Sequence, residues 1–311
     1  MEAKSVQSVA IYVCTFQRNE PLRNLLASLR VAAETVRPEI QVAVVIVDDN
    51  PDGRAKAIAE SEDSGFDLGL HYRHSGAQNI SVARNMGIEA CLELADWVAM
   101  VDDDQVVEPG WLKALIDTQA EFDADAVTGP VFLRYGEEYP NWLHNEPFGQ
   151  ILEAIPQPDG SSVSVCSTGN SMLSSKFLKD NPEIRFRLDL GTVGGEDMVF
   201  YREAVERGLK AHYSLDAVSW GEQPPERSNL NYQLRASMWM GNSEYLTNIE
   251  SGSTTKARMV LRAGKRGLGY LGRPFRRVVS GKNPQIRFTL AGFAQVAGMF
   301  AGVFGVKLEH I

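Results

Sequence analysis

Apolar and polar positions alternate in blocks along the first 125 residues, and the blocks switch between continuous apolar runs and helical spacing. The apolar, β-branched runs predict buried strands at 8–14, 41–47, 68–72 and 97–101. Apolar residues spaced by three and four predict helices at 20–33, 79–94 and 109–122. This strand–helix alternation predicts an α/β fold, namely a doubly wound, mostly parallel sheet with helices on both faces.

The pattern is looser beyond residue 125. We expect a strand at 127–133 and a second strand, leading into a glycine turn, at 163–173. A helix at 196–207 follows two glycines, and a further helix carries Tyr232, Ala236 and Trp239. No internal repeat or long low-complexity segment is visible in this part of the chain.

Composition changes abruptly near residue 250. Ten Lys and Arg residues and no acidic residue lie between Lys256 and Arg287, and a nearly uncharged, glycine-rich run follows at 289–306. The whole chain carries a net charge of −9, whereas residues 1–255 alone carry about −19. We therefore expect an α/β domain at 1–245 and a basic and apolar helical tail at 246–311.

The charge asymmetry predicts the partner of the tail. A basic tail on an acidic body seeks an anionic surface, and the apolar run beside it favours lipid over nucleic acid. We therefore expect 256–306 to contact an anionic membrane surface and no nucleic acid. The run 289–306 is slightly shorter than the roughly 20 residues that cross a bilayer. A spanning helix, an interfacial or re-entrant helix and a helix packed on the domain remain open.

Two features indicate the compartment. The first residues, MEAKSVQSVAIYVC, lack the basic region and cleavage site of a secretory signal. The three cysteines, Cys14, Cys91 and Cys166, are far apart and odd in number, which is typical of buried thiols in a reducing compartment. We therefore expect a cytoplasmic protein that is peripherally associated with the inner face of the cell membrane.

Polar clusters follow three of the predicted strands, at Thr15–Arg18, Asp48–Asp49 and Asp102–Asp104. In doubly wound sheets, ligands bind beyond the carboxyl ends of the strands, where these clusters meet. Three adjacent carboxylates repel one another, and a divalent cation removes that cost. Oxygen ligands suit Mg²⁺ or Mn²⁺, which also bind substrate phosphates. The alternative for Asp102–Asp104 is a solvated acidic turn.

The segment MVDDDQVVEPGW resembles the D-x-D region of family 2 glycosyltransferases, whose nucleotide-binding fold is called GT-A. VCTFQR, VVIVDDNPDG, NISVARNMGIEA, STGNSML and GGEDMVFYREAVERG are similar to further family segments, in the same order, over residues 8–245. WGEQPPERSNLNYQLRASMWMGNS is similar to enzymes of succinoglycan-type exopolysaccharide synthesis. Two departures are Gln17, where the family has Asn, and the absence of Gln-x-x-Arg-Trp, which argues against a processive synthase.

The resemblance implies a set of residues that bind the nucleotide sugar: Thr15, Arg18, Asp48, Asp49, Arg84, Asp102, Asp103, Gly169, Asn170 and Arg235. In the family, the first two lie near the base, and an acidic group after the second strand accepts hydrogen bonds from base or ribose. The sequence does not say whether Asp48 or Asp49 is that group. Arg84 is placed near the start of a helix, where phosphate is favoured.

The resemblance also assigns the chemistry. Asp104 matches the last Asp of D-x-D and is the expected Mn²⁺ or Mg²⁺ ligand, with Asp102 toward the ribose or the waters of the metal. Asp197 is the expected catalytic base, since an acceptor hydroxyl must lose its proton as the new bond forms. Glu196 is expected to orient Asp197 or to touch the acceptor. Both carboxylates open a helix, so a capping role is the alternative.

These observations predict an inverting hexosyltransferase. It would move a hexose from a nucleotide-diphosphate sugar, such as a UDP-sugar, to a glycan or lipid-linked oligosaccharide in bacterial-type polysaccharide biosynthesis. One alternative is a membrane-docked scaffold that binds nucleotide sugar or glycan without turnover. A sugar-nucleotide pyrophosphorylase would need a glycine-rich, basic loop that CTFQRNEP lacks, and a nicotinamide-dinucleotide enzyme would need G-x-G-x-x-G after Val13.

Overall fold

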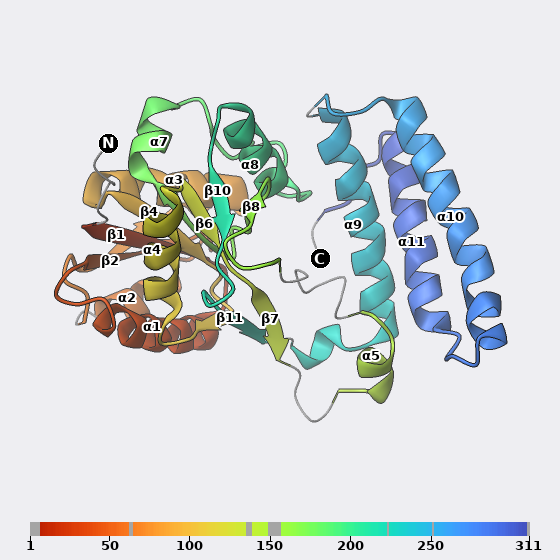
Figure 1. Cartoon of the computed structure of the whole chain (residues 1–311), viewed down its shortest axis with the longest axis horizontal. Coiled ribbons are helices and arrows are strands. Elements are labelled where there is room, and N and C mark those ends of the chain that lie inside the picture. The colour runs from red at the N-terminus through yellow and green to blue at the C-terminus, as the bar shows by residue number, and fades with distance from the viewer. Residues whose placement is uncertain are drawn as a thin grey trace. The chain divides into compact units, whose positions relative to one another are not determined.

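The computed structural model divides the chain into two compact units (Figure 1). It describes residues 7–61, 65–134, 139–148, 157–222, 224–250 and 252–309. The first unit comprises Met1–Arg134, Glu153–Gly191 and Phe200–Glu222. The second comprises Tyr135–Leu152, Thr192–Val199 and Gln223–Ile311. This division differs from the boundary expected at residue 245, because the second unit also takes three segments that precede that residue.

An eight-stranded sheet forms the centre of the first unit, in the order β3-β2-β1-β4-β9-β6-β10-β8. Its strands are β1 (Ser8–Thr15), β2 (Gln41–Asp48), β3 (Leu70–His74), β4 (Trp97–Val101), β6 (Ala126–Thr128), β8 (Ser162–Val163), β9 (Asn170–Ser174) and β10 (Ala211–Tyr213). The pairs among β1 to β4 are parallel, as is the pair β6–β10. Only β9 and β8 run against their neighbours. The predicted mostly parallel α/β sheet is therefore confirmed.

Helices cover both faces of this sheet, because alternate strand residues point to opposite faces. Val9, Ile11 and Val13 pack in one buried cluster with α1 (Asn19–Glu34), α2 (Lys56–Ser61) and α4 (Trp111–Phe122). Ala10 and Tyr12 pack in the other cluster, together with residues of α3 (Ile80–Leu94), α7 (Ser175–Asp180) and α8 (Glu196–Glu206). Of α8, only the part from Phe200 onward belongs to the first unit.

The strand expected at 127–133 is instead two strands in different sheets. β7 (Val131–Arg134) joins β5 (Gln105–Val107) and β11 (Ser219–Glu222) in a three-stranded sheet of order β5-β11-β7. The break falls at Gly129 and Pro130. A Cβ atom on Gly129 would lie 2.1 Å from the carbonyl oxygen of Ala217, and Pro130 has no N–H for a ladder bond. The strand expected at 163–173 is likewise split, and the glycine turn precedes β9.

The second unit is helical. It contains α5 (Asn141–Asn145), the 3₁₀ turn η1 (Pro225–Arg227), α9 (Leu230–Glu250), α10 (Lys256–Val279) and α11 (Ile286–Val303). In Figure 1 the last three, in shades of blue, run side by side, and α11 contacts both others. Within the described ranges, α11 alone is long and apolar enough to cross a membrane, by length and composition only. Since 44% of it is buried inside the protein, it forms part of a packed helical unit.

Glycines allow α9 and α11 to approach closely. A Cβ atom on Gly241 would lie 1.9 Å from the carbonyl oxygen of Gln295, and one on Gly298 would lie 1.8 Å from that of Met238. Beside them, the buried amide of Asn242 donates to the carbonyl oxygens of Gly298 (3.2 Å) and Val306 (2.9 Å). The glycine-rich composition of the tail thus serves helix packing.

We predict that Gly298→Val lowers the free energy of unfolding by about 3 kcal/mol, because the added side chain meets backbone atoms that cannot rotate away. Chemical denaturation monitored by circular dichroism measures this change. The matched control is Gly269→Ala on α10, where no atom lies within 4 Å of the new Cβ. It should be neutral or stabilise the helix by up to about 1 kcal/mol. Equal stability of the two variants would contradict the close crossing.

Candidate functional site

The three polar clusters meet at one edge of the large sheet. Thr15, the last residue of β1, pairs with Asp48, the last residue of β2, and the Asp49 amide donates to the Thr15 carbonyl oxygen (2.9 Å). β4 lies on the other side of β1, so Asp102–Asp104 emerge at the same edge. β9 begins there as well, because Asn170 pairs with Val101. Parallel strand order therefore gathers residues from distant parts of the sequence.

Asp103 is the anchor of this edge. It is buried, and the Thr15 hydroxyl donates to its Oδ2 atom (2.7 Å). The Nη1 atom of Arg18 donates to Oδ1 of Asp103 (2.9 Å) and to Oδ2 of Asp104 (2.8 Å). Burial raises the pKa of Asp103, and the Arg18 charge and the Thr15 hydrogen bond oppose that rise. Asp103 thus holds the loop after β1, which contains Arg18, against the loop Asp102–Asp104, called the acidic loop below.

Asp102 and Arg84 form the second contact of the acidic loop. The Arg84 Nη2 atom lies 3.9 Å from Asp102 Oδ1, and the Gln105 side chain donates to Oδ2 (3.4 Å). Burial among protein atoms raises the pKa of Asp102 to about 6; Arg84 opposes this rise, and Asp104 and Asp103 add to it. Nevertheless 47% of the Asp102 side chain is exposed. A ligand can therefore reach a carboxylate whose negative charge the protein compensates poorly.

Asp48 and Asp49 have different surroundings, although both are buried. Asp48 accepts from the amides of Asn50 (3.0 Å) and Ala55 (2.7 Å) and from the Tyr72 hydroxyl (3.2 Å), so both of its oxygens hold the following loop. Asp49 uses one oxygen, Oδ1, for the Ser75 hydroxyl and the Ala77 amide. Among the described residues, only Oδ1 of Asp49 accepts a hydrogen bond, whereas both oxygens of Asp48 hold the loop.

Gly169 and Asn170 are neighbours in sequence but have different surroundings. A Cβ atom on Gly169 would lie 2.6 Å from Asp102 Oδ2, which places this glycine directly at the acidic loop. Asn170 is completely buried. Its amide hydrogens go to the carbonyl oxygens of Pro130 (2.8 Å) and Ala217 (2.7 Å), and its Oδ1 accepts from Trp111 (2.7 Å). The side chain of Asn170 therefore connects β9 with the segments that contain Trp111, Pro130 and Ala217.

We predict that Gly169→Ala lowers kcat/KM for the donor by roughly tenfold to a hundredfold, because the new methyl group displaces the Asp102 carboxylate. Steady-state kinetics at varied donor concentration measures the effect. The unfolding midpoint should change little, since Asp102 is partly exposed and can move. Gly110→Ala, where no atom lies within 4 Å of the new Cβ, serves as the control. A Gly169→Ala variant with unchanged kcat/KM would exclude a tight contact between this turn and the donor.

The expected acceptor-side residues belong to the second unit. Gly194 (φ 85°) and Gly195 (φ 90°) adopt the left-handed conformation before Glu196 and Asp197. A Cβ atom on Gly194 would lie 2.3 Å from the Trp239 ring, and the indole N–H of Trp239 donates to the Val193 carbonyl oxygen (2.8 Å). The glycine turn that precedes α8 is therefore shaped by α9.

The carboxylates themselves lie at the start of α8. Oδ1 of Asp197 accepts from the amide of Met198 (2.7 Å), whereas Glu196 is buried. Arg235, on α9, is exposed. The contact of Asp197 suits a helix start, and the capping role considered from the sequence is compatible with it.

Three supporting residues lie outside the set expected from the sequence. Gln105 contacts Asp102, Tyr72 contacts Asp48, and Trp239 supports the glycine turn before Asp197. Gln105 directly follows the acidic triplet, so its position was a usable signal. Tyr72 and Trp239 are aromatic residues of a strand and a helix, and nothing in their local sequence separates them from ordinary core residues.

The acidic loop suits a metal that shares its coordination with a substrate. Within the described residues, no group of three or more His, Cys, Asp or Glu converges on one point. Asp102 and Asp104 offer carboxylate oxygens from one loop, and one oxygen of Asp104 bonds Arg18. Mg²⁺ and Mn²⁺ bind through one or two carboxylates together with waters and substrate phosphates. The donor set therefore fits such an ion only together with a diphosphate.

Comparison with known sequences gives consistent results. The model of the family described as "Glycosyl transferase family 2" matches residues 10–181. The succinoglycan biosynthesis protein ExoM of Rhizobium meliloti is 31% identical over 227 residues, which cover 71% of this chain and 69% of that protein. The glucosyl-dolichyl phosphate glucuronosyltransferase of Haloferax volcanii is 32% identical over 242 residues, covering 73% of this chain and 67% of that protein.

Solved structures agree on the fold. S. aureus TarS 1–349 aligns with a TM-score of 0.52 at 13% identity, covering 96% of this chain and 92% of that one. The same protein in complex with UDP-GlcNAc aligns with a TM-score of 0.54, at the same identity and coverage. At this identity the likeness concerns the fold, and the GT-A-like architecture expected from the sequence is confirmed.

Proposed function

Because the chain belongs to glycosyl transferase family 2 and is a glycosyltransferase, we propose that it transfers a hexose, with inversion, from a UDP-sugar. The acceptor in this proposal is a glycan or lipid-linked oligosaccharide in bacterial-type polysaccharide assembly. The main observation behind this proposal is the fixed position of the acidic loop at the carboxyl edge of the sheet. Asp103 bonds Thr15 and Arg18, and Arg84 and Gly169 lie beside Asp102.

The donor side follows from the chemistry of this edge. Asp49 would offer its other carboxylate oxygen to a base or ribose, and Arg18 and Arg84 supply positive charge beside the acidic loop. Gly169 keeps space open next to Asp102. The related fold of TarS is known in complex with UDP and with UDP-GlcNAc, which supports a uridine diphosphate sugar as the donor class.

Asp102 and Asp104 are the residues that would hold a divalent cation, Mn²⁺ or Mg²⁺, against the diphosphate. When bound, such an ion neutralises the charge that develops on the leaving diphosphate. Arg18, already bonded to Asp104, contributes positive charge to the same loop. Asp103 keeps that loop in place through its buried bonds.

The acceptor side rests on Asp197. A carboxylate at the start of a helix can take the proton of the acceptor hydroxyl as that oxygen attacks the anomeric carbon and the bond to the diphosphate breaks. A single displacement of this kind inverts the anomeric centre. In this proposal Glu196 orients Asp197 or touches the acceptor, and Arg235 contacts the diphosphate.

The acceptor and the location are proposed from relatives and from charge. One relative is named for succinoglycan biosynthesis, and another is named for glucosyl-dolichyl phosphate, a sugar on a lipid phosphate. The basic tail over 256–306 would hold the enzyme at the inner, cytoplasmic face of the membrane, next to a lipid-linked acceptor. The proposal includes no nucleic-acid partner, because the apolar run beside the basic residues favours lipid.

A transfer screen tests the proposal. The full chain is incubated with a panel of nucleotide sugars, beginning with UDP-glucose, with and without Mn²⁺, and the release of nucleotide diphosphate is measured. The anomeric configuration of the product is read by NMR. Turnover of UDP-sugars with inversion is expected. In a parallel incubation, formation of nucleotide sugar and pyrophosphate from sugar 1-phosphate and nucleoside triphosphate would indicate a pyrophosphorylase. Donor binding without turnover would indicate a scaffold.

A further inference from the structure

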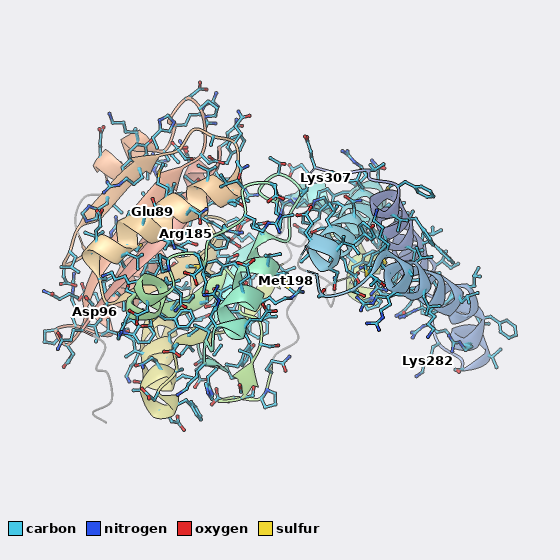
Figure 2. All side chains as sticks on the ribbon, turned by 90° about the horizontal axis from the view of Figure 1, so that it is seen from above. Glu89, Asp96, Arg185, Met198, Lys282 and Lys307 are labelled. Carbon is cyan, nitrogen blue, oxygen red and sulfur yellow. The ribbon has the colours of Figure 1, made fainter. Side chains whose placement is uncertain are left out.

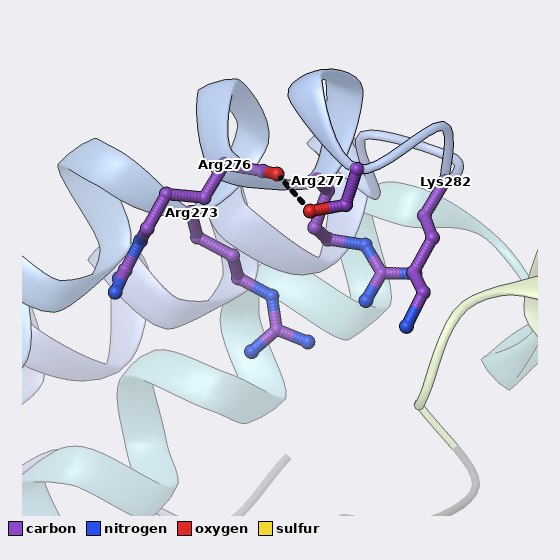
Figure 3. Close-up of a pocket in the computed structure, with 5 residues that line it drawn as sticks. Arg273, Arg276, Arg277 and Lys282 are labelled. Atoms are coloured by element: carbon purple, nitrogen blue, oxygen red, sulfur yellow. Dashed lines mark hydrogen bonds between the residues drawn. The ribbon is translucent and has the colours of Figure 1, made fainter.

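A strongly basic pocket lies at the C-terminal end of α10, where the chain turns into α11 (Figure 3). Its volume is about 340 Å³. It is lined by four cationic side chains and one hydroxyl group, those of Arg273, Arg276, Arg277, Lys282 and Ser280. Figure 3 shows the cationic groups of Arg273, Arg277 and Lys282 extending to the same side of the helix end. Such a cluster costs electrostatic energy unless an anion is bound.

Some other cations of the second unit have carboxylate partners. Arg266 bonds Glu244 (2.6 Å), Arg287 pairs with Glu146 (3.4 Å), and Lys307 pairs with Glu250 (3.5 Å). In the described part of the chain, by contrast, none of the four pocket cations pairs with a carboxylate.

Among the residues that the structure describes, the pocket guanidinium groups bond only neutral groups. Arg277 donates to the Asn283 carbonyl oxygen (2.6 Å), and Arg273 donates to the Gln285 side chain (2.8 Å). The Nε atom of Arg273 is buried, and no described group accepts its hydrogen. A buried donor without a described acceptor, among four cations without carboxylate partners, suits an anion with several acceptor oxygens.

We propose that this pocket binds the phosphate of a membrane lipid head group while α10 lies in the bilayer interface. The inference rests on the membrane association proposed above, and it adds a defined site to it. Guanidinium groups recognise phosphate oxygens by paired hydrogen bonds, and Lys282 adds a mobile charge. A phosphomonoester, which exposes three oxygens, matches this set of donors better than a phosphodiester does.

The exposed apolar face of α10 is the reason to propose a lipid phosphate rather than a free phosphate ion. Leu261, Leu268, Leu271 and Phe275 are spaced by seven, three and four residues and therefore share one face. All four are exposed, Phe275 by 73% and Leu268 by 70%. Val278 and Val279 continue this face, whereas the buried residues Met259 and Ala263 lie on the other side. Such a face next to basic residues is typical of helices that lie in a membrane interface.

The pocket and the apolar face meet at Arg276, whereas Arg273 and Arg277 lie further around the helix, on the side of the buried Met259 and Ala263. Arg276 follows Phe275 and points about 100° around the helix from it. A helix whose apolar side chains enter the acyl region therefore keeps Arg276 at head-group level. Figure 2 shows Lys282 and Lys307 at opposite ends of the α10–α11 pair, so the basic pocket marks one end of these helices. A free phosphate ion would explain the pocket but not the exposed apolar face.

Vesicle binding of the full chain tests the proposal. Three vesicle types are used: phosphatidylcholine alone, phosphatidylcholine with phosphatidylglycerol, and phosphatidylcholine with phosphatidic acid. The two anionic types are adjusted to equal zeta potential. Co-sedimentation should show binding to both anionic types, and a preference of roughly tenfold for phosphatidic acid. The pocket variant is Arg276→Gln with Lys282→Gln, and both residues are exposed.

The matched control is Arg258→Gln with Lys265→Gln, which removes two exposed charges of α10 outside the pocket. Both double variants should weaken binding to phosphatidylglycerol vesicles similarly, by about fivefold per charge. Only the pocket variant should lose the preference for phosphatidic acid. If the pocket variant retained the preference for phosphatidic acid, or if the control variant lost it equally, the proposed phosphate site would be refuted. No vesicle binding by the unmodified chain would instead refute the membrane association itself.

A third arm distinguishes lipid from free phosphate. Leu268→Asn with Phe275→Asn leaves every charge in place but should reduce binding to both anionic vesicle types by more than tenfold, because apolar burial is lost. Inorganic phosphate at buffer concentrations should compete weakly with phosphatidic acid vesicles. Full competition by inorganic phosphate, together with unchanged vesicle binding of the apolar variant, would assign the pocket to a soluble phosphate and overturn the proposal.

Discussion

Asp197→Asn is expected to lower kcat for sugar transfer by about 10²- to 10⁴-fold while leaving the affinity for the donor unchanged. The amide cannot take the proton of the acceptor hydroxyl, but it keeps the size and polarity of the side chain. Asn also serves well at helix starts, so the contact with the Met198 amide and the stability of α8 should survive. Release of nucleotide diphosphate, followed in the presence of acceptor, measures kcat.

The control for this variant is Glu206→Gln, an exposed residue in the last turn of the same helix. It should transfer sugar at the unmodified rate. Titration with UDP should give equal affinities for both variants and for the unmodified chain. Transfer by Asp197→Asn at more than a tenth of the normal rate would leave Asp197 only its role at the helix start.

Asp104→Asn is expected to reduce kcat/KM by about 10²- to 10³-fold, and removal of divalent cations by EDTA should reduce transfer at least as much. One carboxylate oxygen of Asp104 already bonds Arg18, so the second oxygen would have to serve a cation. The ion pair with Arg18 is partly exposed, and its loss should cost at most about 1 kcal/mol of stability. Kinetics at varied Mn²⁺ concentration measures the change.

Binding of Mn²⁺ in the presence of UDP, followed by electron paramagnetic resonance, separates metal binding from donor binding. Asp104→Asn should weaken Mn²⁺ binding, and the surface control Asp117→Asn on α4, whose partner is Lys113, should not. Full transfer after EDTA treatment would refute a metal at this loop. A variant that loses transfer but binds Mn²⁺ normally would move Asp104 to the donor contacts.

The strands and helices of the first hundred residues could be predicted from the sequence because local pattern and tertiary structure agree there. Each residue of β2 after the first is buried, so the continuous apolar run QVAVVIV is the direct signature of a strand covered on both faces. The helix with Leu22, Leu25, Leu26 and Leu29 buries all four of these residues. Parallel strands then bring their carboxyl ends to one edge, so the meeting of the polar clusters was also predictable.

Long-range contacts limited the rest. Gly129 and Pro130 divide one apolar run between two sheets, and the cause is the carbonyl oxygen of Ala217, far along the chain. Asp103 stands at the variable position of the motif, yet Thr15 and Arg18 bury and bind it. The side chain of Asn170 makes three hydrogen bonds with distant segments of the chain. Local sequence contains no information about such partners.

The crossing of α9 and α11 at Gly241 and Gly298 changes the meaning of the C-terminal helices. α9 supports, through Trp239, the glycine turn that leads to Asp197, and α11 in turn supports α9. A chain truncated before α10 would therefore lose part of the support of its proposed base together with the proposed membrane contact. Replacing these helices by an unrelated membrane anchor should therefore impair the catalytic unit. A fusion that replaces α11 must preserve the small residues where α9 and α11 cross.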